Sequence, residues 1–216
     1  MSFNLPNYRK IEEFIKKNAQ RKVKIVAITK YHPVESVQEA INSGVRIFGE
    51  NRVQEAKNKY LKLKDTFGGI ELHLTGPLQT NKVKNALQIF DVFQTLDREK
   101  LAIEFHKHKE SLQEKNFFVQ INTGKEDSKS GVYPESADEF IKYCVNDLNL
   151  PVVGLMCIPP SQENPTPHFS LLRKFAEKNN LKQLSIGMSG DYKEAILAGA
   201  THIRVGTVLF GSRNEK

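Results

Sequence analysis

The stretch QLSIGMSGDYKEAILAGATHIRVGTVLF (183–210) contains the unit that decides the fold. Two short apolar runs, QLSIGM (183–188) and HIRVGTVLF (202–210), flank a segment that opens on a turn rich in glycine and serine and continues with helical spacing. A strand, a helix and a second strand in this order predict a βαβ unit with two parallel strands. The same pattern recurs upstream along the chain.

Six further apolar or β-branched runs precede this unit. They are KIVAIT (24–29), VRIFG (45–49), ELHLTG (71–76), DVFQTL (91–96), FFVQIN (117–122) and VVGLMCI (152–158). The starts of the eight runs lie about 25 residues apart on average, which is the length that a strand plus its crossover helix requires. Because eight parallel strands close without an exposed edge, the pattern predicts an α/β fold of the (β/α)8 TIM barrel type rather than an open sheet.

The segments between the runs support this barrel. Pro33 precedes one predicted helix, which closes on Gly44, and Tyr133-Pro134 precede another. An extra N-terminal helix over roughly 5–20 is expected to cap the lower end of the barrel. The proline-rich PPSQENPTP (159–167) predicts a long loop between a strand and a helix. No low-complexity linker divides the chain, so residues 1–216 are predicted to form a single domain.

The composition argues against nucleic-acid-binding, membrane, secreted and metal-binding proteins. The net charge is +7, but the lysines are dispersed along helical segments, which argues against a nucleic-acid surface. No run approaches the roughly 18 apolar residues of a membrane helix, and the start of the chain lacks a signal peptide. Cys144 and Cys157 have no metal-ligand spacing and are expected to be buried thiols. These features predict a cytoplasmic protein that binds neither membranes nor nucleic acid and holds no metal.

Lys30 is the first candidate site residue. It follows the run 24–29 and has the strand parity of Val26 and Ile28, so it points into the barrel if they do. One interpretation is a lysine whose tip reaches solvent at the rim. The other is a lysine whose amine, with its pKa lowered by burial and nearby cations, forms a Schiff base with an aldehyde.

The last two runs end in residues that suit an anion. Ser189 lies in a turn that can start a helix, while Gly206 and Thr207 offer a close backbone approach and a hydroxyl group. Loops after the seventh and eighth strands are the usual phosphate site of this fold. Arg204 shares the face of Gly206 and can point inward, where it needs an acceptor. That acceptor is either a ligand group, such as a pyridine nitrogen, or an acid at the barrel wall.

Other strand ends carry weaker signals. Asn51 follows the second run and can cap the next helix. His73 and Thr75 share parity and suit either rim packing or turn chemistry. The polar loop INTGKEDSKSG (121–131) is expected to be mobile, because it holds few apolar anchors. Met156 and Ile158 are expected to lie in the core.

Seven segments together resemble the pyridoxal phosphate homeostasis protein family. They are VAITK, FGENRVQEA, HLTGPLQTNKVK, INTGKEDSKSG, GLMCI, SIGMSGDYKEAILAGATHIRVGT and LFGSR. The resemblance implies a barrel like the N-terminal domain of alanine racemase, with pyridoxal 5′-phosphate (PLP) bound to Lys30. It further implies that Arg204 faces the pyridine nitrogen, that Ser189, Gly206 and Thr207 bind the phosphate, and that Asn51 lies near the ring. Two positions depart from the family pattern: His32 stands where many members have a second lysine, and Gly190 where relatives often have alanine.

The resemblance and the residues together predict a PLP carrier rather than an enzyme. PLP enzymes place an acid or base beside the cofactor, and few such groups stand at the strand ends here. The racemases continue into a second domain that dimerises, for which the 216 residues leave no room, so a monomer is expected. Apo-PLP enzymes are the expected recipients of the cofactor. The alternative function is that of a PLP-dependent amino-acid racemase or decarboxylase.

Overall fold

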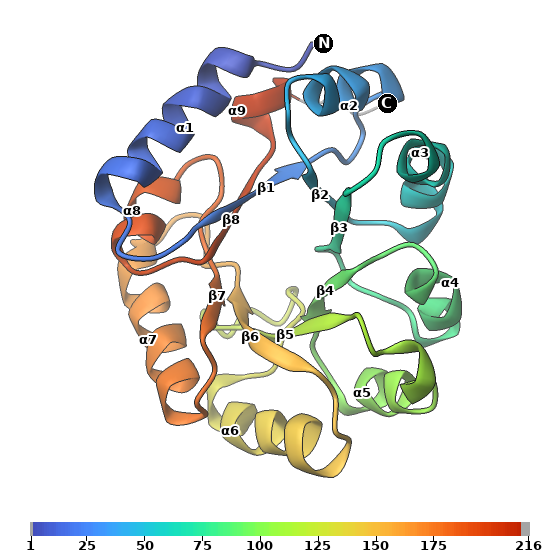
Figure 1. Cartoon of the computed structure of the whole chain (residues 1–216). Coiled ribbons are helices and arrows are strands. Elements are labelled where there is room, and N and C mark those ends of the chain that lie inside the picture. Colours follow the sequence, from blue (N-terminus) through green and yellow to red (C-terminus); the bar gives the residue numbers. More distant parts are fainter. Residues whose placement is uncertain (1, 213–216) are drawn as a thin grey trace.

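A computed structural model describes residues 2–212 as a closed barrel of parallel strands surrounded by helices, as predicted (Figure 1). Within these residues the strands pair in chain order and β8 closes the barrel onto β1. The strands are β1 (Lys24–Ile28), β2 (Ile47–Glu50), β3 (Glu71–Leu74), β4 (Val92–Leu96), β5 (Asn116–Ile121), β6 (Val152–Cys157), β7 (Gln183–Ser185) and β8 (His202–Val205). Each strand begins within about two residues of its predicted run.

The α-helices form a ring outside the strands (Figure 1). They are α1 (Leu5–Asn18), α2 (Val34–Asn42), α3 (Val53–Thr66), α4 (Val83–Leu87), α5 (Glu99–His106), α6 (Pro134–Lys142), α7 (Pro165–Lys178), α8 (Tyr192–Leu197) and α9 (Thr207–Phe210). Three further turns of helix are η1 (Thr80–Lys82), η2 (Lys109–Ser111) and the π-helical η3 (Tyr143–Asp147). Proline residues open α6 and α7, where their missing amide hydrogens cost no helical hydrogen bond.

Two predicted elements differ in the structure. The run 202–210 is not one strand, because β8 ends at Val205 and Thr207–Phe210 turn into the short helix α9. A short apolar run does not by itself distinguish strand from helix. Helix α1 does not cap an end of the barrel either. It packs on the outside against α8 and α9, with Phe14 against Tyr192 and the amide of Asn4 donating to the carbonyl of Leu209 (Figure 1).

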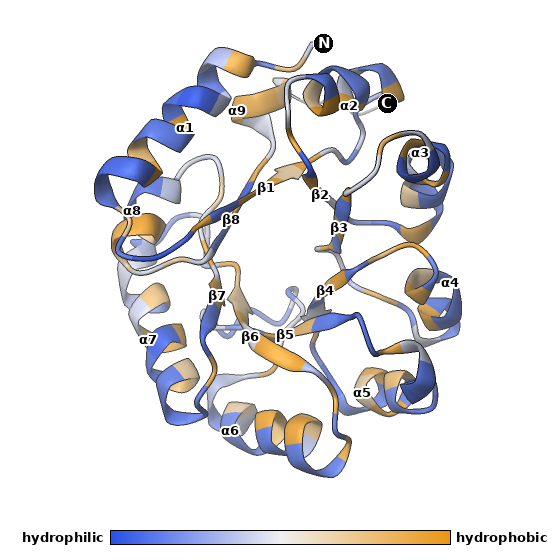
Figure 2. Cartoon of the chain, viewed as in Figure 1, coloured by the Kyte–Doolittle hydropathy of each residue, from blue (hydrophilic) through white to orange (hydrophobic). Residues whose placement is uncertain are grey.

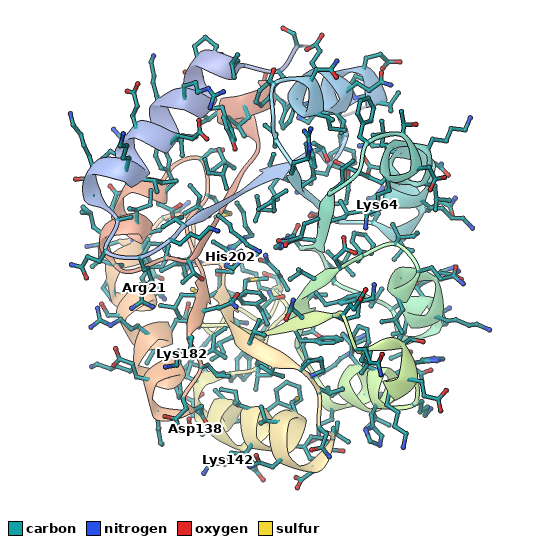
Figure 3. All side chains as sticks on the ribbon, in the orientation of Figure 1. Arg21, Lys64, Asp138, Lys142, Lys182 and His202 are labelled. Atoms are coloured by element: carbon teal, nitrogen blue, oxygen red, sulfur yellow. The ribbon has the colours of Figure 1, made fainter. Side chains whose placement is uncertain are left out.

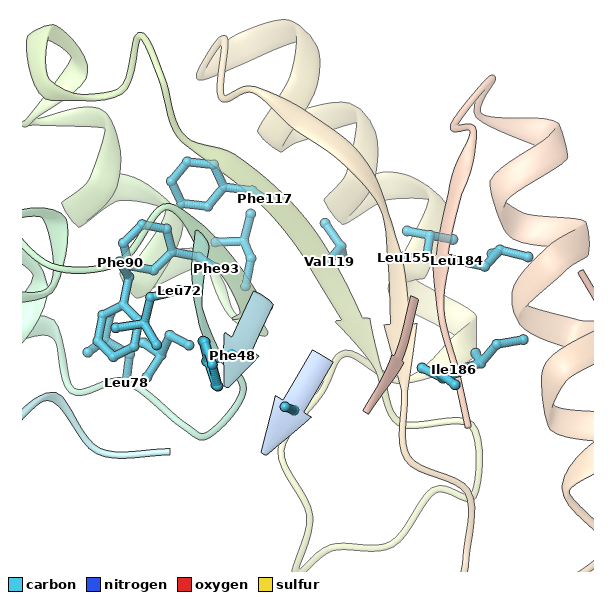
Figure 4. Packing of buried hydrophobic residues seen from close by; sticks show 14 of the residues in the cluster. Phe48, Leu72, Leu78, Phe90, Phe93, Phe117, Val119, Leu155, Leu184 and Ile186 are labelled. Atoms are coloured by element: carbon cyan, nitrogen blue, oxygen red, sulfur yellow. The ribbon is translucent and has the colours of Figure 1, made fainter. Parts of the chain in front are cut away.

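The main core lies between the strands and the helices. The helices turn their apolar faces inward and their polar faces outward (Figure 2). Alternate residues of the strands meet them, for example Phe93 and Phe117, whose rings stack 5.1 Å apart (Figure 4). Cys144 and Cys157 are both buried there, as predicted. No helix within residues 2–212 combines the length and the apolar character needed to cross a membrane.

The barrel interior is also filled by side chains (Figure 3). A small apolar cluster of Val92, Phe118 and Met156 occupies part of it, and the ring of His202 contacts Phe118 at 5.1 Å. Met156 therefore lies in the core, as predicted. The buried side chains of Gln94, Ser185 and Arg204 form hydrogen bonds with one another across this interior, so polar groups also collect inside the barrel.

Candidate functional site

All six site residues predicted from the sequence line one cavity. Its volume is about 300 Å³, and it lies where β1, β2, β7 and β8 end. The lining residues are Ile28, Lys30, Asn51, Thr75, Ile158, Met188, Ser189, Gly190, Arg204, Gly206 and Thr207. The carboxyl ends of the strands are where barrels of this type carry their functional groups.

Strand parity explains how Lys30 reaches this cavity. Ile28 and Lys30 both line it, so the side chain of the lysine continues the inward face of β1, as predicted. Lys30 is half-buried. Thr75 and Ile158 also line the cavity, although the sequence assigned Ile158 to the core and left Thr75 open. Their parity with His73 and Met156 was the signal that they point inward.

Arg204 lines the cavity and is buried. It donates to the hydroxyl of Ser185 at 2.6 Å and to the carbonyl oxygen of Cys157 at 2.8 Å. Burial lowers the pKa of its guanidinium to about 10, so the group stays charged at neutral pH. Within residues 2–212 it forms no ion pair with a carboxylate, so the acid partner that the sequence left open is not found there.

A chain of buried hydrogen bonds leads from Arg204 across the barrel interior. The Ser185 hydroxyl donates to the side-chain oxygen of Gln94 at 2.6 Å, so the amide nitrogen of Gln94 faces Nδ1 of His73 at 2.7 Å. Nε2 of His73 then carries the proton and lies 2.7 Å from a carboxylate oxygen of Glu71. Burial lowers the pKa of His73, which agrees with this neutral tautomer. Four strands together therefore orient the guanidinium of Arg204.

Asn51 contributes to the cavity differently from the sequence expectation. It does not cap α3, because the residue before that helix is Arg52 and no side chain caps it. The side-chain oxygen of Asn51 instead accepts a hydrogen bond from the hydroxyl of Thr75 at 2.9 Å. Gly76 lies so close that an added Cβ would stand 2.6 Å from the backbone oxygen of Asn51. The loops after β2 and β3 are thus packed directly against each other at the cavity.

The end of the cavity beside β7 and β8 is rich in hydrogen-bond donors. The hydroxyl oxygen of Ser189 accepts from the amides of Gly206 at 3.3 Å and Val208 at 3.5 Å. The amides of Ser189, Gly190 and Thr207 donate to no acceptor within residues 2–212. Three unused amides together with the Thr207 hydroxyl suit the several oxygen atoms of a phosphate group.

A buried network that the sequence did not predict holds the turn containing Lys30. Glu50 is fully buried and accepts from the Thr29 hydroxyl at 2.7 Å and from Lys59 at 3.0 Å. Lys59 also binds Glu55, whose carboxylate accepts from the amide of Tyr31 at 2.6 Å. Burial raises the pKa of Glu50 to about 7. Both neighbours of Lys30 are therefore anchored to β2 and α3.

The polar loop 121–131 is more ordered in its contacts than expected. The amide group of Asn122 donates to the carbonyl oxygens of Glu126 and Lys129, and its oxygen accepts from the amide of Glu126. Hydrogen bonds from the side chain of Asn122 thus hold this loop in place of apolar contacts.

We expect that replacing Gly187 disturbs the geometry of this site, and that replacing Gly190 does not. Gly187 has φ of +89°, and a Cβ there would lie 2.4 Å from Cβ of Ala195. Its carbonyl oxygen accepts from the amide of Arg204. Gly187→Ala should therefore lower the free energy of unfolding by about 2–4 kcal/mol, because backbone strain and overpacking add. Gly190→Ala, with nothing within 4 Å of its Cβ, should change it by less than about 1 kcal/mol. Urea unfolding of both variants is the measurement, and equal losses would contradict this account.

Comparison with known proteins assigns the family. The family model "Alanine racemase, N-terminal domain" matches residues 6–214. The pyridoxal phosphate homeostasis protein of Aquifex aeolicus is 40% identical over 201 residues, which are 88% of this chain and 87% of the relative. The chain belongs to the pyridoxal phosphate homeostasis protein family. Its relatives carry the name of a homeostasis protein rather than that of an enzyme.

Solved structures agree with this family. PipY of Synechococcus elongatus, a structure with PLP bound, superposes with a TM-score of 0.83 at 31% identity, covering 95% of this chain and 100% of PipY. Alanine racemase from Acinetobacter baumannii shares the fold with a TM-score of 0.74 at 18% identity, covering this whole chain but 64% of the racemase. The barrel is thus common to the homeostasis proteins and to part of the racemase chain.

Proposed function

We propose that this member of the pyridoxal phosphate homeostasis family binds PLP in the cavity and holds it through a Schiff base on Lys30. The observation that carries the proposal is the composition of the cavity. An amine from β1 stands in the same space as the three unused amides near β7 and β8. PLP carries an aldehyde and a phosphate on one small planar ring. The aldehyde suits the amine of Lys30, and the phosphate suits the three amides. When bound, PLP supplies an aldehyde that condenses with the amine and releases water.

The remaining residues suit a holding role. Arg204 is charged and lines the cavity, so it can donate a hydrogen bond to the ring nitrogen but does not protonate it. Asn51 and Thr75 form one side wall. Ser189, Gly206 and Thr207 are the proposed phosphate contacts. An unprotonated ring is a weak electron sink, which favours storage over amino-acid chemistry.

The absence of turnover is proposed on the same residues. None of the described residues that line the cavity carries a carboxyl, imidazole, thiol or phenol group. Lys30 is then the one candidate base among them, whereas PLP enzymes place an acid or base on each side of the cofactor. We further propose that the protein acts in the cytoplasm as a monomer and passes PLP to apo-PLP enzymes. A closed barrel, which leaves no strand edge for pairing, supports the monomer.

Two measurements on purified protein test the proposed function. Addition of PLP should produce the yellow absorbance of an imine and saturate at one PLP per chain. The same sample, given alanine in deuterated water, should exchange the α-proton far more slowly than an enzyme does, because Lys30 is the one acid or base among the described residues that line the cavity. An alanine racemase is the positive control. Absence of the imine absorbance from protein separated from free PLP would contradict the Schiff base, and exchange at the rate of the racemase would contradict the carrier role.

A further inference from the structure

A second cavity opens beside the one described above, and no part of the proposed function uses it. Its volume is about 740 Å³, and it shares Asn51 with the PLP cavity. Tyr31, which directly follows Lys30, also lines it. The remaining walls come from the loops and first helical turns after β2, β3 and β4, at the carboxyl ends of these strands. The two cavities thus divide one face of the barrel between them.

The second cavity is strongly basic. Arg52, Lys57, Lys82 and Arg98 line it, and none of its described lining residues is acidic. We call it the basic cavity. Like charges around one hollow repel each other, and an anion placed among them removes that repulsion. A cavity with this lining therefore favours a ligand with more than one negative charge.

The charges of the basic cavity are largely unneutralised by the protein itself. Arg98 is the exception, because it pairs with Asp97 at 2.5 Å and donates to the carbonyl oxygen of Leu78. Arg52 lies over the ring of Tyr31, 5.5 Å from its centre. The side chains of Lys57 and Lys82 form no ion pair or hydrogen bond within residues 2–212. Arg52, Lys57 and Lys82 thus remain available to a ligand.

The other lining residues indicate the chemical class of that ligand. Gln54, Gln79 and Asn85 offer carboxamide groups, which donate and accept hydrogen bonds without charge. A volume of several hundred Å³ in a concave site is typical of small-molecule binding rather than of a protein docking surface. Phosphate groups carry two negative charges and several acceptor oxygens, which match arginine and lysine donors.

We propose that the basic cavity is a second anion site, which binds a small polyphosphate or an organic phosphate no larger than a nucleotide. Since Asn51 lines both cavities and Tyr31 of the basic cavity directly follows Lys30, an anion bound there also changes the affinity of the neighbouring cavity for PLP; this consequence alone rests on the proposed function. The coupling is reciprocal, so PLP changes the affinity for the anion by the same factor.

Calorimetric titration of PLP-free protein tests the site, with inorganic pyrophosphate and ADP as the probes. Wild type should bind at least one probe at one site per chain. Lys57→Gln with Lys82→Gln should weaken binding by about 10-fold to 100-fold, because two charge-assisted contacts are lost. The matched control is Lys62→Gln with Lys84→Gln, which makes the same charge change on neighbouring residues outside the lining. This control should weaken binding by less than about threefold.

Three outcomes would overturn the proposal. One is the absence of saturable binding by either probe. Another is an equal loss of probe binding in the two double variants, which would indicate that the anions are attracted to the basic protein surface in general. The last concerns Ser189→Asp, which places a carboxylate in the PLP cavity: loss of binding in this variant alone would mean that the probe occupies the PLP cavity. Binding of both probes without any binding of PLP would leave the anion site standing and refute the PLP function separately. A preference for ADP over pyrophosphate would identify an organic phosphate as the ligand.

Discussion

Borohydride reduction of the PLP-loaded protein should label Lys30, and Lys30→Ala should abolish the labelled peptide. Lys30 is the one lysine among the described residues that line the cavity, so no other described amine stands where it can replace it. The turn around it keeps its own anchors through Thr29, Glu50 and Tyr31, none of which is altered by the substitution. The free energy of unfolding without PLP should therefore change by less than about 1 kcal/mol.

Peptide mapping after reduction is the measurement, and urea unfolding of the PLP-free variant checks the fold. Lys125→Ala and Lys129→Ala are matched controls, because both lysines lie in the loop 121–131 and bind acidic partners at the surface. Both variants should keep the label on Lys30. Label on Lys125 or Lys129 in the wild type would contradict the assignment of Lys30.

The stability of the protein should depend steeply on pH in the acid range, mainly because of His202. His202 is buried on β8 (Figure 3). Burial lowers its pKa to about 3, so the folded protein keeps this ring neutral down to that pH. The unfolded chain binds the proton at an ordinary histidine pKa near 6.5. Between these values the unfolded state holds one more proton, so stability is lost as pH falls, by about 1.4 kcal/mol per pH unit from this group.

Glu71 and Glu50 also change the dependence of stability on pH, in opposite directions. Contacts with His73 and Lys24 outweigh burial and lower the pKa of Glu71 to about 2, so its contribution is also lost as pH falls below an ordinary carboxyl pKa. Burial raises the pKa of Glu50 to about 7, so its folded form keeps a proton that the unfolded chain releases. Stability from Glu50 is therefore lost as pH rises from about 4.5 to about 7. Between about pH 4.5 and 6.5 the loss from Glu50 as pH rises opposes the gain from His202, and the steep loss lies below about pH 4.5, where His202 and Glu71 act in the same direction.

Urea unfolding from pH 3.5 to 7.5 separates these groups. His202→Gln should flatten the profile by about one proton below pH 6.5, and Glu50→Gln should steepen it between about pH 4.5 and 6.5. Comparing slopes rather than absolute stabilities removes the cost of replacing a buried side chain. A His202→Gln profile parallel to that of the wild type would mean that His202 does not control the acid limb.

The sequence alone determined the barrel and six of the residues that line the first cavity. Strand spacing and period-2 parity are local properties, so the inward direction of Ile28, Lys30 and Arg204 followed from their positions. Turn chemistry after the last two strands likewise indicated Ser189 and Gly206. The role of each residue toward PLP, and the single domain over 1–216, remain predictions.

Only the tertiary structure decided which polar groups meet inside the barrel. The chain from Arg204 through Ser185, Gln94 and His73 to Glu71 joins four strands separated by up to 133 residues, from 71 to 204. The choice of Asn51 to bind Thr75 rather than to cap α3, and the gathering of four cations around the basic cavity, also depend on loops that are distant in the sequence. Barrel closure sets such neighbours, since it brings the ends of all strands to one mouth, whereas residue spacing reports only the direction of each side chain within its own strand.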